Sequence, residues 1–192
     1  MSLLTQETRI LEIGSGAFGL ISFFPESNCR YGIDPLEYYY STVNEFVNQR
    51  DSIVTYSTGK GEKLAFEDSF FDIILLDNVL DHCESPNEVL KEIKRVAKPQ
   101  SFIFFRQNTY NCYGKLMRNI MEFFLIDKGH PYTFTKSNIT RLFKNDFELI
   151  DFNRNGYCST WKAEITSNKT IDKIKAILFI TRDKSTYFWR KK

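Results

Sequence analysis

Residues 9–19 read RILEIGSGAFG, an apolar run that leads into three glycines. Gly14, Gly16 and Gly19 have the spacing G-x-G-x-x-G, which is typical of a strand that turns into a helix beside a bound dinucleotide. Such a turn needs glycine because the backbone must bend tightly and approach the ligand closely. The segment therefore predicts a strand, a ligand-binding turn and a short helix that stops near Pro25.

A carboxylate follows the second predicted strand, Tyr31–Ile33. Asp34 lies 20 residues after Gly14, where a carboxylate can accept hydrogen bonds from both hydroxyls of an adenosine ribose. The glycine turn and Asp34 together predict a cofactor that contains adenosine, and they leave NAD open. The alternative is a tight strand-to-helix turn that binds no ligand.

Glu12 stands two residues before the first glycine, a place where a dinucleotide fold normally has an apolar strand residue. A buried acid is costly unless it meets a partner. With Glu12, the motif resembles the E/D-x-G-x-G motif of class I S-adenosylmethionine-dependent methyltransferases. In that family the acid lies near the methionine end of the cofactor, whose ammonium is a natural partner. A salt bridge to a lysine or arginine is the structural alternative.

The resemblance continues along the chain. Residues 61–66 (GEKLAF), with Phe71 and Asp72, resemble the stretch that borders the adenine in that family. Residues 76–82 (LDNVLDH) resemble the end of strand four and the turn after it, and residues 90–99 (LKEIKRVAKP) resemble the next helix and its exit. The order and spacing of these motifs, rather than any one of them, carry the resemblance over residues 10–105.

Membership of this family implies an α/β fold of three layers, a doubly wound, mostly parallel, Rossmann-like sheet of seven strands with one antiparallel. S-adenosylmethionine would bind at the carboxyl ends of the strands. The residues implied in cofactor binding are Glu12, Gly14, Ser15, Gly16, Asp34, Pro35, Gly61, Glu62, Asp77 and Asn78. The glycine turn would approach the methionine and ribose, Asp34 the ribose hydroxyls, Gly61 and Glu62 the adenine, and Asp77 or Asn78 the sulfonium.

Three features depart from the family pattern. Phe18 stands where a third glycine is common, and Lys60 stands where an acid often contacts the adenine. The first strand also begins so early that a helical cap over the substrate is missing or supplied elsewhere. These departures motivate a second hypothesis, a degenerate methyltransferase fold that serves as a non-catalytic binding subunit.

A third hypothesis is an NAD-dependent oxidoreductase, which rests on the glycine spacing and Asp34 alone. No Tyr-x-x-x-Lys pair supports it after the fifth strand, because Tyr110 and Tyr113 are followed four residues later by Gly114 and Met117.

Methyl transfer from a sulfonium is an in-line displacement, so the enzyme mainly aligns the acceptor and excludes water. A general base is needed only for an acceptor proton of high pKa. His130 is the candidate base or orienting group, because it ends the long segment after the fifth strand. Asn108, Tyr110, Tyr113 and Met117 are candidate walls of the acceptor pocket. The expected acceptor is a small or lipid-like molecule.

Periodicity predicts the remaining elements. One helix is expected from Leu36 to Val47, with its apolar residues on one face. Further strands are expected at Ser52–Tyr56, Ile73–Leu76 and Phe102–Phe105, and helices at residues 85–96, 113–126 and around 139–143. The last two strands are expected at Phe147–Phe152 and Ile177–Thr181, paired antiparallel.

Length and composition narrow the classes of protein. A chain of 192 residues favours a single domain, residues 1–192, and a net charge of +2 gives no signal for nucleic acid. Four cysteines without CxxC spacing and two histidines indicate neither a metal site nor a disulfide framework. Without a signal peptide or a membrane span, we expect a cytoplasmic protein with a solvated basic tail at Trp189–Lys192. Association into a homo-oligomer, or ordering of the segment from Asn108 to Tyr132 over the cofactor, would cover the open site, and the length of that segment favours the second.

Overall fold

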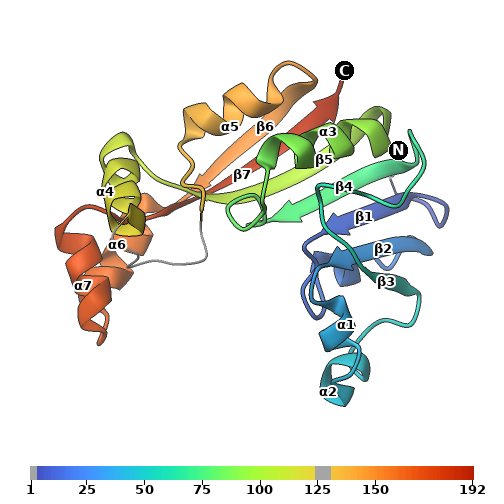
Figure 1. Cartoon of the computed structure of the whole chain (residues 1–192), viewed down its shortest axis with the longest axis horizontal. Helices are drawn as coiled ribbons and strands as arrows, with labels where there is room; N and C mark the ends of the chain where they lie inside the picture. Colours follow the sequence, from blue (N-terminus) through green and yellow to red (C-terminus); the bar gives the residue numbers. More distant parts are fainter. Residues whose placement is uncertain (1–3, 124–130) are drawn as a thin grey trace.

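The computed structural model describes residues 4–123 and 131–192. Within these ranges the chain forms one sheet of seven strands in the order β3-β2-β1-β4-β5-β7-β6 (Figure 1). The strands are β1 (Arg9–Ile13), β2 (Cys29–Asp34), β3 (Val54–Thr58), β4 (Phe71–Asp77), β5 (Ala97–Thr109), β6 (Phe147–Asn155) and β7 (Asp183–Lys191). The first five run parallel, and β7 is antiparallel to both of its neighbours. The predicted fold class is confirmed.

The helices are η1 (Leu20–Phe23, a 3-10 helix), α1 (Glu37–Tyr40), α2 (Asn44–Val47), α3 (Pro86–Val96), α4 (Cys112–Phe123), α5 (Lys136–Phe143), α6 (Tyr157–Thr166) and α7 (Thr170–Ile177). Figure 1 shows α3 and α5 over one face of the sheet, and α4, α6 and α7 gathered beyond the end toward which β1 and β4 point. The start of α3 is as the sequence predicts: Ser85 caps it, with Pro86 as its first residue.

The main core lies between the sheet and the two helices α3 and α5. Alternate residues of the central strands point into it, as the period of two in a strand requires. Its members include Leu11, Ile13, Ile74, Leu76, Ile103, Phe105, Val89, Ile93, Ile139 and Phe143. This burial fixes the sheet and leaves the carboxyl ends of β1, β2 and β4 free to build a site.

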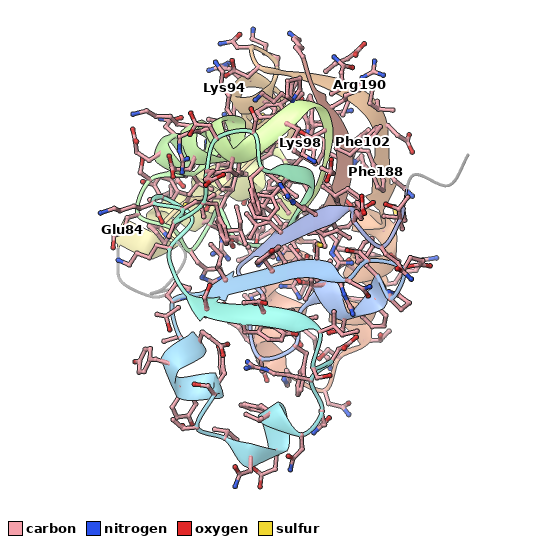
Figure 2. The ribbon with its side chains drawn as sticks, turned by 90° about the vertical axis from the view of Figure 1, so that its right-hand side faces the viewer. Glu84, Lys94, Lys98, Phe102, Phe188 and Arg190 are labelled. Carbon is pink, nitrogen blue, oxygen red and sulfur yellow. The ribbon has the colours of Figure 1, made fainter. Side chains whose placement is uncertain are left out.

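The opposite face of the sheet is covered unevenly. Near β1, Ile10 and Leu75 pack against Ile21 of η1. Farther along, Phe102, Phe104 and Phe188 line an apolar hollow of about 730 Å³ (Phe102 and Phe188 are labelled in Figure 2). This hollow includes Pro99 and Gln100, so it lies at the amino end of the long strand β5. Ligands of such sheets bind at the carboxyl ends, and we therefore do not take it as the candidate site.

The single helix predicted from Leu36 to Val47 is wrong. The structure has two short helices, α1 and α2, separated at Val43, whose backbone is extended (φ −97°, ψ 105°). The supposed apolar face is not buried either, since Leu36 is 48% and Tyr39 is 55% exposed. β-Branched residues such as Thr42 and Val43 favour helix weakly, and the exposed apolar residues of this segment contribute little burial to compensate.

The last predicted strand is also wrong. Ile177 ends α7, and the strand that pairs with β6 is β7, which contains the residues expected to form a solvated tail. Trp189 is only 1% exposed and belongs to the main core. In β7, buried residues such as Tyr187 and Trp189 alternate with exposed ones such as Lys184 and Phe188, and its charged residues conceal that pattern in the sequence.

Candidate active site

The glycine turn joins the ends of β1 and β2. The backbone N–H groups of Gly14 and Ser15 both donate to the carbonyl of Ile33, at 2.8 and 3.0 Å. Gly16 has a φ of +57°, and a Cβ added to it would meet nothing within 4 Å. The turn therefore keeps an open space beside Gly16, as a closely approaching ligand requires.

Asp34 ties this turn to the end of β2. Its Oδ2 accepts a hydrogen bond from the N–H of Gly16 at 3.0 Å, and its Oδ1 accepts one from the N–H of Leu36 at 2.8 Å. A carboxylate has about four acceptor positions, so these bonds orient the group and leave capacity for ligand hydroxyls.

A pocket of about 590 Å³ lies at these strand ends. Seven of the ten predicted cofactor residues line it: Gly14, Asp34, Pro35, Gly61, Glu62, Asp77 and Asn78. Glu12, Ser15 and Gly16 are not among its lining residues. The pocket also includes residues that the prediction did not contain: Ile13, Leu36, Tyr40, Gly59, Lys60, Val79, His82, Cys83 and Glu84. Sequence periodicity placed Leu36 and Tyr40 on a buried helix face, which is why they were missed.

Glu12 lies behind the turn. Its side chain is 2% exposed, and its two oxygens accept hydrogen bonds from the N–H groups of Leu20 (2.9 Å) and Ile21 (2.7 Å) at the start of η1. The partner of this buried acid is thus the N-terminus of a short helix, where backbone donors are unsatisfied. A Cβ on Gly19 would lie 2.2 Å from Oε2 of Glu12, which explains why a glycine follows Phe18.

Burial raises the pKa of Glu12 to about 7, and the two backbone hydrogen bonds oppose the shift only in part. The unfolded chain releases this proton near the ordinary value of 4.5, whereas the folded protein keeps it to about pH 7. The contribution of Glu12 to the free energy of unfolding is therefore fully present at low pH, and it is lost as the pH rises from 4.5 through 7.

We expect the free energy of unfolding to fall by about 3 kcal/mol over that range because of Glu12, at about 1.4 kcal/mol per pH unit. Urea unfolding at several pH values would measure it. In Glu12→Gln, which keeps one acceptor oxygen and does not titrate, the fall should be smaller by this amount. Parallel pH profiles for the two proteins would show that Glu12 has an ordinary pKa.

Asp77 ends β4 and forms an ion pair with Arg106 of β5. Nε of Arg106 donates to Oδ1 at 2.6 Å, and Nη2 donates to Oδ2. The pair raises the pKa of Arg106 and compensates the charge of Asp77. Asn78 follows with a φ of +57°, and its Oδ1 accepts from Gln107 Nε2 and the N–H of Asn108, both at 3.1 Å. Its amide NH₂ can therefore donate into the pocket.

Lys60 and Glu62 act mainly on the loop before α3. Oε1 of Glu62 accepts from the N–H groups of Glu84 (2.7 Å) and Ser85 (3.3 Å). Nζ of Lys60 lies 2.5 Å from Oε1 of Glu84. The positive charge of Lys60 is thus compensated beside the pocket, and this lysine does not by itself argue against a bound adenine.

The residues predicted for an acceptor pocket are Asn108, Tyr110, Tyr113, Met117 and His130. His130 lies outside the described residues. Asn108 and Tyr110 line a polar pocket of about 220 Å³, together with Asp81, Arg118 and Tyr132. Tyr113 and Met117 are not part of its lining, and Tyr113 is 47% exposed.

Residues 4–123 and 131–192 contain neither a metal-binding cluster nor a membrane-spanning helix. There, no three His, Cys, Asp or Glu side chains are grouped so that they could hold a metal ion. None of the helices in these ranges combines the length and the apolar character needed to cross a bilayer.

The family model for the methyltransferase domain matches residues 11–105, from β1 through most of β5. The chain belongs to the class I S-adenosylmethionine-dependent methyltransferase family. The matched segment contains the glycine turn, Asp34, Asp77 and Asn78, which form the candidate site. S-adenosylmethionine is the cofactor that this family implies. The open space beside Gly16 and the carboxylate of Asp34 fit it.

Among curated methyltransferases, the uncharacterized methyltransferase C1B3.06c of Schizosaccharomyces pombe is 28% identical over 106 residues, which are 50% of this chain and 38% of that protein. The thiol S-methyltransferase TMT1B of Rattus norvegicus is 28% identical over 124 residues, 62% of this chain and 51% of that protein. The chain thus spans about half or less of the length of these methyltransferases.

A solved methyltransferase has the same fold. Geranyl diphosphate C-methyltransferase from Streptomyces coelicolor A3(2), in complex with Mg²⁺, geranyl diphosphate and S-adenosyl-L-homocysteine, matches with a TM-score of 0.74 over 98% of this chain and 72% of that one. At 12% identity, this likeness concerns the fold alone.

Proposed function

We propose that this chain binds S-adenosylmethionine in the pocket at the ends of β1, β2 and β4, and transfers its methyl group to a small-molecule or lipid-like acceptor. One observation carries the proposal: Gly14, Asp34 and Asp77, from three neighbouring strands, line a single pocket. The pocket lies where the strand order reverses, because β2 and β4 lie on opposite sides of β1. Ligands of doubly wound sheets bind at this switch point.

The residues divide the pocket into regions. Asp34 would accept hydrogen bonds from the ribose hydroxyls, with Leu36 and Tyr40 as apolar walls on that side. Gly61 and Glu62 would flank the adenine, and the side chain of Glu62 ties their loop to the loop before α3. Ser15 and Gly16 in the turn would lie near the methionine, and Asp77 and Asn78 beside the sulfonium.

The bound cofactor supplies an activated methyl group on a cationic sulfur. The work of the protein is then to orient the acceptor and to exclude water. The Asp77–Arg106 pair presents little net charge beside the sulfonium, so its electrostatic effect on the positive sulfur is small. Glu12 supports the turn from behind. His130 stays the predicted base or orienting group.

Two methyltransferases similar to this chain are named for different acceptor atoms. One is a thiol S-methyltransferase and the other a geranyl diphosphate C-methyltransferase. The family alone therefore leaves the acceptor open. A binding subunit without activity stays the second candidate, but the Lys60–Glu84 ion pair removes one of the reasons for it.

Calorimetric titration of the purified chain with S-adenosylhomocysteine and NAD tests the cofactor assignment. We expect S-adenosylhomocysteine to bind and NAD to give no heat of binding. Asp34→Ala should weaken the binding of S-adenosylhomocysteine by about tenfold or more, because it removes charge-assisted hydrogen bonds to the ribose. Asp34→Asn keeps one acceptor oxygen for the turn, so its affinity for S-adenosylhomocysteine should lie between those of wild type and Asp34→Ala. Binding of NAD alone would point to the oxidoreductase instead.

A further inference from the structure

A second hollow adjoins the cofactor pocket on the acceptor side. It has a volume of about 250 Å³ and is lined by Asp77, Asn78, Arg106, Asn108, Arg182 and Lys184. Asp77 and Asn78 belong to both hollows. The two therefore meet at the turn after β4, where the sulfonium would lie under the proposed function.

Strand register brings the lining residues together. Arg106 is paired with Asp77 across β4 and β5, and Asn108 is paired with Lys184 across β5 and β7. Arg106 and Asn108 are two residues apart on β5, so their side chains lie on the same face of the sheet. Arg182 lies two residues before Lys184 and completes the group beside the end of β5.

The hollow has an excess of positive charge. Asp77 is compensated by Arg106, which leaves Arg182 and Lys184. Arg182 also lines the polar pocket that contains the carboxylates of Asp81, Glu164 and Asp172, whereas Lys184 lines only the hollow beside Asp77. Within residues 4–123 and 131–192, no carboxylate forms an ion pair with either of these two cations. The side-chain NH₂ of Asn78 adds a neutral donor, because the Oδ1 atom of that residue is already bonded. Guanidinium, ammonium and amide donors in one hollow match the oxygens of a carboxylate or a phosphate.

We propose that Arg182 and Lys184 bind an anionic group, a carboxylate or phosphate, of the methyl acceptor. This inference rests on the proposed function and adds the chemical class of the acceptor. The strand order β1-β4-β5-β7 places Lys184 three strands from the glycine turn, about 14 Å at the usual strand spacing. Arg182 and Lys184 would thus hold the anionic group of the acceptor away from the atom that receives the methyl group. This contact would orient the acceptor.

The carboxylate of the cofactor's own methionine is a second source of the same chemistry. We assign the cations to the acceptor because the glycine turn, on β1, approaches the methionine, whereas Lys184 lies beyond β4 and β5. 5′-Methylthioadenosine lacks the amino acid part of the cofactor, so comparing it with S-adenosylhomocysteine separates the two sources.

The test uses the full chain as wild type, as Arg182→Gln/Lys184→Gln, and as a matched control, Arg141→Gln/Lys173→Gln. The control changes one exposed arginine and one exposed lysine outside both hollows, with the same loss of charge. Binding of S-adenosylhomocysteine and 5′-methylthioadenosine is measured by calorimetry. Inorganic phosphate and acetate are then titrated into the S-adenosylhomocysteine complex, with amide NMR shifts of residues 182–184 as the signal.

We expect phosphate or acetate to shift these amides, and the site variant to bind that anion about tenfold more weakly while the control behaves as wild type. S-adenosylhomocysteine should bind all three proteins equally. If the site variant binds S-adenosylhomocysteine more weakly than wild type but binds 5′-methylthioadenosine equally well, the two cations belong to the cofactor site. Equal loss in the control, or no shift with either anion, would also overturn the proposal. Failure of S-adenosylhomocysteine to bind wild type would instead overturn the proposed function.

Discussion

Gly16→Val is expected to weaken the binding of S-adenosylhomocysteine by about a hundredfold or more. A Cβ on Gly16 meets no protein atom within 4 Å, so the valine side chain has room in the free protein. That room is the space into which the cofactor would fit, and a branched side chain fills it. The φ of +57° adds backbone strain of about 1–3 kcal/mol. Calorimetry gives the loss of affinity, and thermal unfolding gives the strain.

The control is Gly16→Ala, which carries a similar backbone strain with a single methyl group. We expect Gly16→Ala to lower the free energy of unfolding almost as much as Gly16→Val does. It should weaken the binding of S-adenosylhomocysteine far less. If Gly16→Val binds S-adenosylhomocysteine as wild type does, the cofactor lies elsewhere and the site is wrong.

Among glycine-to-alanine substitutions in the turn, Gly19→Ala should lower the free energy of unfolding most. Its Cβ would lie 2.2 Å from Oε2 and 2.9 Å from Cδ of Glu12, so the carboxylate must move. The N–H groups of Leu20 and Ile21 then lose their acceptor. Loss of these two bonds, with the strain of a φ of +71°, is expected to lower the free energy of unfolding by about 4 kcal/mol. Urea unfolding measures it.

Gly16→Ala serves as a partial control, because it has a positive φ without the contact and should lose about 1–2 kcal/mol. Gly19, at φ +71° and ψ 169°, has a backbone conformation essentially confined to glycine, so its own backbone strain is larger. A double-mutant cycle isolates the contact. With Glu12→Ala already present, Gly19→Ala should cost no more than the backbone strain. Additive effects of the two substitutions would mean that Glu12 and Gly19 do not interact.

The order of the elements from β1 to β5 could be predicted from the sequence because their signals are local. A strand that ends in Gly14, a carboxylate after the second strand, and a proline-started helix after Ser85 each depend on neighbouring residues. The apolar runs of buried parallel strands are equally visible. For this reason most of the predicted cofactor residues line the pocket in the structure.

Where local signals were weak, the prediction failed. Residues 36–47 have an apolar spacing of three and four, yet Leu36, Tyr39 and Val47 of that face are exposed and the helix breaks at Val43. β7 was taken for a basic tail because Lys184, Arg190 and Lys191 obscure its alternation. The buried face of such a strand is recognised only when its partner strands are known, and one of the two partners of β7, β5, is about 80 residues away along the chain.

The type of fold and the position of the glycine turn were thus determined by the sequence, because glycine spacing and strand periodicity act over a few residues. The tertiary structure alone decided which groups meet. Glu12 turned to the N-terminus of η1, Asp77 to Arg106, and Lys60 to Glu84. Lys184 reached the acceptor side of the site only through the antiparallel pairing of β7 with β5. Such contacts depend on sheet order and register, which connect residues far apart in the chain and leave no mark in any one segment.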